Sequence, residues 1–166
     1  MTFADNARKK ALHYSRFTDG SVLADDSGLE VDALRGAPGI KSRRFAGPAA
    51  TDADNNVKLL GLLSAVPAAK RTARFVCELA LAQRGELRAQ FRGVAEGLIL
   101  SKPRGEGGFG YDPLFLDPKA GKTFAELLPE EKLARSHRGR AFRALLDWLL
   151  ANSSQEARGA RAGGDD

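Results

Sequence analysis

The sequence predicts an α/β fold, because segments with helical periodicity alternate with segments that have the composition of strands. Apolar residues recur at helical spacing in residues 3–17 and 51–65. Residues 73–83 and 87–100 instead read as two strands joined by a hairpin turn. A last helix is predicted to run to about residue 151, and 166 residues are enough for one domain with a proper core.

The first predicted helix covers residues 3–17 and follows Thr2, a residue that suits the N-cap position. Asn6 and Lys10 are four residues apart on this helix and therefore share a face. One of them could orient a substrate while the other meets a phosphate. The spacing is equally compatible with a solvated basic face of the helix.

Two adjacent carboxylates, Asp25 and Asp26, follow a short apolar run at residues 22–24. We interpret this pattern as a buried strand that ends at an opening, where it delivers acidic side chains, with Ser27 beside them. Mg²⁺ prefers oxygen ligands and is commonly held by one or two carboxylates together with substrate phosphates. Asp25 and Asp26 are therefore candidate metal ligands. The alternative is a polar turn before a second strand at residues 29–34.

The loop at residues 35–47 contains three glycines and a proline and cannot continue regular structure. It carries Ser42, Arg43 and Arg44. An arginine fork can donate two parallel hydrogen bonds to a phosphate, although either arginine could equally pair with a structural carboxylate.

A second loop, at residues 101–112, is rich in glycine and ends in the run Phe109, Gly110, Tyr111 and Asp112. Its backbone N–H groups could cradle a phosphate, but the lysine and Ser/Thr of a Walker motif are absent. Phe109 on a Gly-flanked turn could instead stack against a purine base. A phenylalanine of the core is the alternative.

The C-terminal part is predicted to form a short helix from Thr123, a break at Pro129 and then the long helix. Polar residues gather at the junction, namely Lys132, Ser136, His137 and Arg138. A 6-keto purine offers an acceptor where adenine offers a donor, so donors from His137 and Arg138 could tell inosine from adenosine. A helix cap is the simpler reading. Adjacent serine and histidine cannot easily form a nucleophile and its base.

The composition limits the classes of protein to which the chain can belong. The single cysteine, Cys77, excludes an intrachain disulfide and fits a reducing cytoplasm, and no apolar stretch approaches a membrane span or a signal peptide. The net charge of +5 fits an anionic ligand, but acids are interspersed with the bases, which argues against a nucleic-acid-binding stripe. Residues 1–152 are expected to form one domain, and the polar, Gly-rich residues 153–166 a disordered tail.

Several blocks of the chain resemble the Ham1/inosine triphosphatase family of pyrophosphohydrolases. The most specific is ADDSGLEVDALRGAPGIKSRRFAG at residues 24–47. The others follow in family order: TFADNARKKA, NNVKLL, GGFGYDPLF, KTFAEL and KLARSHRGRA. Together these blocks cover the chain from Thr2 to about Trp148.

This resemblance implies a long mixed sheet flanked by helices, with a central cleft. It also implies hydrolysis of non-standard purine nucleoside triphosphates (ITP, dITP, XTP) to the monophosphate and pyrophosphate, with Mg²⁺ as cofactor and a homodimeric assembly. Asp26 would act as general base or metal ligand, with Asp25 as a second ligand. The substrate would contact Asn6, Lys10, Ser27, Phe109, Gly110, Tyr111, Asp112, Lys132, His137 and Arg138.

One family block has no counterpart, since the opening strand with its Thr/Ser-Gly-Asn-x-x-Lys phosphate loop would lie before Met1. We therefore expect the 166-residue chain to hydrolyse inosine triphosphate poorly. The rival hypothesis is a catalytically impaired nucleotide-binding or interaction protein with the same fold.

Overall fold

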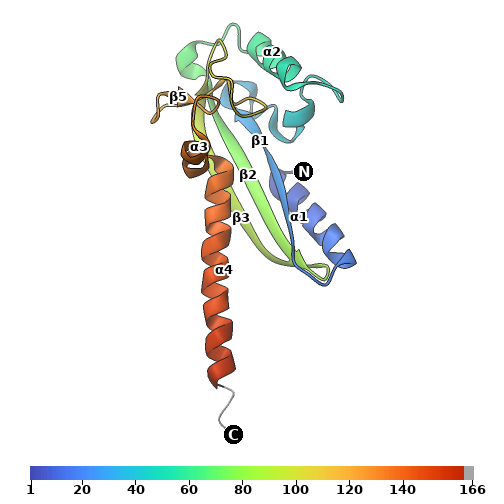
Figure 1. Ribbon diagram of the computed structural model, residues 1–166. Helices are drawn as coiled ribbons and strands as arrows, with labels where there is room; N and C mark the ends of the chain where they lie inside the picture. The colour runs from blue at the N-terminus through green and yellow to red at the C-terminus, as the bar shows by residue number, and fades with distance from the viewer. Residues whose placement is uncertain (163–166) are drawn as a thin grey trace.

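Three long strands form the centre of the protein, as the computed structural model shows for residues 1–162, with side chains described to residue 153 (Figure 1). They are β1 (Val22–Val31), β2 (Thr72–Gln83) and β3 (Glu86–Ile99). The short strands β4 (Phe115–Asp117) and β5 (Lys122–Thr123) extend the sheet beyond β3, in the order β1-β2-β3-β4-β5. The helices are α1 (Phe3–Tyr14), α2 (Asp52–Leu62), α3 (Pro129–Arg135) and α4 (His137–Ala162).

The predicted α/β architecture is confirmed, with one difference in the sheet. A mixed sheet was expected, whereas all four strand pairings among the described residues are antiparallel. The hairpin between β2 and β3 turns at Arg84 and Gly85, whose φ angles are 51° and 81°. Two positive φ angles give a turn whose twist matches that of the strands it joins.

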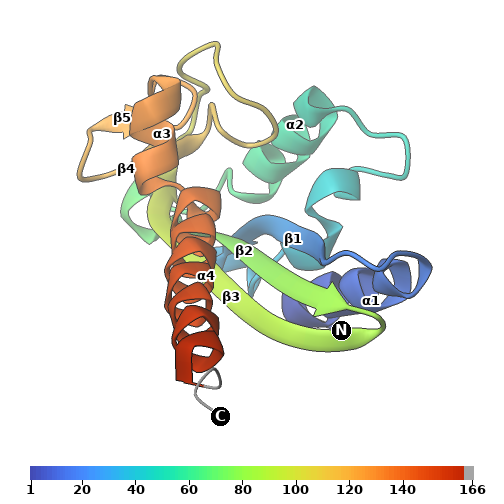
Figure 2. The same cartoon turned by 60° about the horizontal axis from the view of Figure 1, so that its bottom comes forward.

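Helices α1 and α4 cover opposite faces of the three long strands (Figure 2). Ala7 and Ala11 of α1 pack with Ala80 and Ala82 of β2. On the other face, α4 packs on Cys77 and Leu79 of β2 through Ala141 and Leu145. Odd-numbered residues of β2 therefore point to α4 and even-numbered residues to α1, because successive side chains of a strand alternate.

A larger apolar cluster lies at the end of the sheet next to α2. Its aromatic centre is formed by Phe75, Phe115 and Phe124, with ring centroids 4.6 and 4.8 Å apart for the contacts that Phe115 makes. Leu59 of α2 and Leu29 of β1 are fully buried in the same cluster. This cluster attaches α2 and the segment after β3 to the long strands, and so fixes the loops between them.

Several boundaries differ from the expected ones. Instead of ending near residue 24, β1 continues to Val31, and a 3₁₀ turn at Asp32–Leu34 replaces the end of the expected second strand. Residues 122–123 are a strand rather than the start of a helix, and Pro129 begins α3 instead of breaking it.

The C-terminal helix is longer than expected. Because α4 runs to Ala162, it includes residues 153–162 of the segment expected to be a disordered tail, and residues 163–166 lie outside the described part. Within the described residues, no helix combines the length and apolar composition needed to cross a bilayer.

Candidate active site

Asp26 lies in the middle of β1, on the face covered by α1. Both of its carboxylate oxygens are engaged by that helix, since Asn6 Nδ2 donates to Oδ2 at 3.0 Å and Lys10 Nζ lies 2.8 Å from Oδ1. Lys10 also donates to the Asp25 carbonyl at 2.8 Å. The four-residue spacing of Asn6 and Lys10 thus directs both side chains to one carboxylate, as their shared helical face predicts.

Asp25 points to the opposite face of the sheet, toward α4. Its Oδ2 accepts hydrogen bonds from Ser27 Oγ at 3.2 Å and from Arg138 Nη2 at 3.2 Å. The expectation that Asp25 and Asp26 form a pair of ligands at a strand tip is wrong in this respect. They are neighbours inside a continuous strand, and alternation separates their side chains by the thickness of the sheet.

This placement limits how a metal could be held. Among the described residues there is no group of three or more His, Cys, Asp or Glu side chains arranged for a metal ion. The Asp26 side chain is 19% exposed and offers hard oxygen ligands. The residues present therefore fit an ion held by one carboxylate together with substrate phosphates and water, and do not fit a cage made only of protein ligands.

Phe109 lies at the tip of the glycine-rich loop and its side chain is exposed, with 60% of its surface accessible. The reading of Phe109 as a core residue is therefore wrong. Its backbone N–H donates to Asp112 Oδ2 at 2.9 Å, and Lys132 Nζ forms a partly buried ion pair with the same carboxylate. A Cβ atom added at Gly108 would collide with the Asp112 carboxylate, so glycine is required there.

Two cations flank the Phe109 ring. Lys132 Nζ lies 4.7 Å and Arg138 Cζ 5.3 Å from its centroid. Arg138 is also the partner of Asp25, so one guanidinium contacts both the sheet and the glycine-rich loop. The structure thus connects Asp25 of β1 with the aromatic loop through Arg138, while Asp26 faces α1 on the other side of the same strand.

Tyr111 departs from its expected role as a substrate contact. Only 4% of the residue is exposed, and its hydroxyl donates to the Ser42 carbonyl at 2.7 Å. Burial raises the pKa of this phenol, with the Asp52 charge as a smaller cause. Tyr111 therefore ties the glycine-rich loop to the loop after β1 and presents no ring to a ligand.

The backbone of Gly110 is held by α2, a contact that the sequence analysis missed. Asp52 Oδ2 accepts from the Gly110 N–H at 2.7 Å, and Asn56 Nδ2 donates to the Gly110 carbonyl at 2.9 Å. The only sequence signal was the four-residue spacing of Asp52 and Asn56, and nothing in it indicates a partner more than fifty residues away.

His137 is the first residue of α4 and immediately precedes Arg138 in the chain. It is almost fully buried, with 6% of its surface exposed. Its ring stacks on Phe75 at a centroid distance of 4.8 Å, and its Nδ1 is buried without a hydrogen-bond partner among the described residues. Burial, together with the charges of Arg138 and Lys132, lowers the pKa of this imidazole to about 3. His137 is therefore neutral at physiological pH.

Ser42, Arg43 and Arg44 have different surroundings. Ser42 is structural, because its hydroxyl accepts from Leu29 N–H at 2.9 Å and donates to the Gly39 carbonyl at 2.6 Å. Arg43 and Arg44 are exposed on the same loop.

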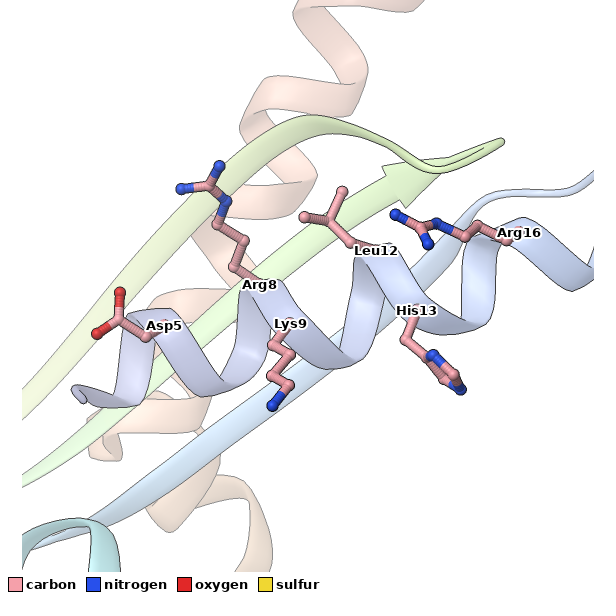
Figure 3. Close-up of a pocket in the computed structure, with 6 residues that line it drawn as sticks. All are labelled: Asp5, Arg8, Lys9, Leu12, His13 and Arg16. Atoms are coloured by element: carbon pink, nitrogen blue, oxygen red, sulfur yellow. The ribbon is translucent and has the colours of Figure 1, made fainter.

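A surface depression of about 510 Å³ lies along the outer side of α1 (Figure 3). Its lining residues are Asp5, Arg8, Lys9, Leu12, His13 and Arg16. None of them contacts Asp26 or the glycine-rich loop in the described hydrogen bonds and ion pairs, and the depression does not coincide with the expected central cleft. We therefore place the candidate active site at Asp26, Arg138 and Phe109.

Comparison with known proteins finds similarity to one family. The model of the Ham1 family matches residues 1–148. A dITP/XTP pyrophosphatase of Desulforamulus reducens is 55% identical over 148 residues, which are 89% of this chain and 74% of the relative. A dITP/XTP pyrophosphatase of Thermus thermophilus is 53% identical over 146 residues, covering 88% of this chain and 70% of the relative.

Solved structures agree with this result. A HAM1 protein from Coxiella burnetii superposes with a TM-score of 0.86 at 45% identity, covering 90% of this chain and 77% of that one. The Ham1 protein of Staphylococcus aureus gives a TM-score of 0.87 at 41% identity, covering 92% and 78%.

Proposed function

The chain belongs to the Ham1 family, and on this basis we propose that it hydrolyses non-standard purine nucleoside triphosphates to the monophosphate and pyrophosphate. Relatives more than half identical over most of the chain are dITP/XTP pyrophosphatases. The observation that carries the proposal is that Arg138 joins Asp25, the strand neighbour of Asp26, to the exposed ring of Phe109. A reactive carboxylate and a base-stacking surface are the two parts that this reaction needs.

Asp26 is the residue assigned to the attacking water. Asn6 and Lys10 hold its carboxylate, so that one oxygen lone pair can accept a proton from water as the water oxygen bonds to the α-phosphorus. The bond between that phosphorus and the bridging oxygen breaks, and the oxygen leaves with pyrophosphate. Lys10 is 47% exposed and can therefore also attract a triphosphate oxygen.

Phe109, Lys132 and Arg138 are assigned to the nucleotide. The exposed ring of Phe109 offers a stacking surface for a purine. Arg138 lies beside this ring and carries donors only, so it favours the 6-keto acceptor of inosine or xanthosine over the 6-amino group of adenosine. Gly110 shapes this pocket through its backbone turn, and Asp112 does so through its ion pair with Lys132. His137 contributes as the first residue of α4, where it precedes Arg138.

The reaction is metal-dependent, and we propose Mg²⁺ as the ion. Asp26 would hold it jointly with the triphosphate, because this carboxylate supplies hard oxygen ligands at the surface of the sheet. When bound, Mg²⁺ neutralises phosphate charge that develops as pyrophosphate leaves. We also propose that the protein is a homodimer. Its proposed location is the cytoplasm, and the buried free thiol of Cys77 supports this location because thiols stay reduced there.

Replacing Asp26 with asparagine tests the assignment. The substitution keeps the shape of the side chain but removes a base and an anionic ligand used in the transition state. We expect kcat for inosine triphosphate to fall by about three orders of magnitude or more, with little change in melting temperature. Pyrophosphate release with and without Mg²⁺ measures the effect. Parental turnover by Asp26→Asn would show that another group activates the water.

A further inference from the structure

We infer that α2 positions Phe109 for the purine base, because its side chains Asp52 and Asn56 form hydrogen bonds with the backbone of Gly110. Asp52 accepts from the Gly110 N–H at 2.7 Å and Asn56 donates to its carbonyl at 2.9 Å. Both polar groups of the residue that follows Phe109 are thereby fixed from one helix. The inference rests on the proposed function, because it concerns the residue assigned to the base.

Hydrogen bonds, rather than packing, hold this tip of the loop. Gly110 has a φ angle of 61°, and a Cβ atom built on it would meet nothing within 4 Å. Phe109 is 60% exposed, so its ring is not fixed by a surrounding core. The charge-assisted bond from Gly110 to Asp52 therefore has a large influence on where the ring lies.

The loop has a second anchor on the opposite side of Phe109. The Phe109 N–H donates to Asp112, which is paired with Lys132 of α3. Asp112 and Lys132 belong to the proposed substrate site, whereas the hydrogen bonds that the structure describes for the Asp52 and Asn56 side chains go to the loop backbone. The α2 anchor can thus be removed without deleting a residue that touches substrate, which makes Asp52 and Asn56 positioning residues.

Substitutions of Asp52 provide the test. For Asp52→Ala we expect KM for inosine triphosphate to rise about tenfold with kcat within about twofold, because a charge-assisted hydrogen bond to the loop is lost. Selectivity for inosine over adenosine triphosphate should fall in parallel. Asp52→Asn retains an acceptor oxygen and should restore KM to within about threefold of the parent. Hydrogen–deuterium exchange of residues 105–112 in the substrate-free protein should be faster in Asp52→Ala than in the parent.

Two further variants separate positioning from stability. Asp54 lies in the same first turn of α2 and caps Thr51 without contacting Gly110, so Asp54→Ala should lower the melting temperature and leave selectivity unchanged. Asn56→Asp is nearly isosteric but turns an acceptor oxygen toward the Gly110 carbonyl, and should act in the same direction as Asp52→Ala.

The outcomes distinguish this inference from the proposed function. A parent protein that releases no pyrophosphate from any purine triphosphate would contradict the function itself. An active parent whose KM, selectivity and loop exchange are all unchanged in Asp52→Ala would overturn only the inference. Faster exchange with unchanged KM and selectivity would overturn it as well, because the anchor would then have no consequence for the base.

Discussion

His137 shows at the residue scale how burial is converted into a dependence of stability on pH. Its pKa is lowered to about 3 in the folded protein, mainly because the ring is buried against Phe75. In the unfolded chain the pKa of histidine is about 6.5. Below that pH the unfolded chain binds a proton that the folded chain does not bind, so stability is lost as the pH falls from about 6.5 toward about 3.

The loss of stability that is due to His137 can be measured by comparison with a variant that has no titrating group at this position. Between pH 8 and pH 5 the parent should lose about 2 kcal/mol more free energy of unfolding than His137→Phe, which keeps an aromatic ring against Phe75. Urea unfolding of both proteins at the two pH values measures the difference. The other titrating groups are common to both proteins and cancel. The same pH dependence in both would show that His137 takes up a proton in the folded state.

The sequence identified most side chains of the candidate site but misjudged how two of them point. Asn6 and Lys10 meet at Asp26 as their helical spacing predicts. Asp25 and Asp26 were interpreted together because they are adjacent, and adjacency in a strand means opposite faces. The run of Asp, Asp, Ser and Gly has the composition of a turn, and only its pairing with β2 along its full length makes it a strand.

At the scale of elements, the contact between α4 and β3 decides where His137 and Arg138 lie. A Cβ atom added at Gly93 of β3 would overlap the backbone of α4 at His137 and Ala141. Glycine at this position therefore allows the helix to approach the strand at the turn that carries both site residues. Nothing in the sequence names the partner of Gly93, which lies more than forty residues away.

Gly93→Ala tests this contact. Because the helix must shift, we expect a loss of about 1–3 kcal/mol in the free energy of unfolding. The value of kcat/KM for inosine triphosphate should fall as well, since the shift displaces Arg138. Gly61→Ala in α2 is the matched control, because an added Cβ atom there meets nothing within 4 Å and alanine favours a helix. Equal stability of the two variants would mean that α4 does not pack closely at Gly93.

The element boundaries that were wrong have different physical causes. The end of β1 is set by its register with β2, a partner distant in sequence, whereas α3 starts at a local signal, the cap in which Glu131 accepts from the Leu128 N–H. Pro129 was interpreted as a break, but the first turn of a helix tolerates proline because its N–H would have no intrahelical partner. The long helices and the β2–β3 hairpin were predictable because their signals are local.

At the scale of the whole molecule, the site joins two parts of the fold that the chain builds separately. The first comprises α1, β1 and β2 and supplies Asp26, with Asp25 on the face toward α4. The second comprises the glycine-rich loop, held between α2 and α3, and supplies Phe109. Arg138, at the start of α4, contacts both parts, since it pairs with Asp25 at 3.2 Å and lies over the Phe109 ring. Base recognition should therefore depend on how the sheet orients Arg138.

A double-mutant cycle measures that dependence. Arg138→Ala should lower kcat/KM for inosine triphosphate more than for adenosine triphosphate, because it removes a donor that only the 6-keto purine can use. Asp25→Ala should reduce the same selectivity by a smaller factor, since it frees the guanidinium from the sheet without deleting it. The double variant should be no less selective than Arg138→Ala alone, because Asp25 acts on the base only through Arg138. Additive effects, or equal losses for both substrates, would show that Arg138 serves the phosphates or the fold, and that the sheet and the loop recognise the nucleotide independently.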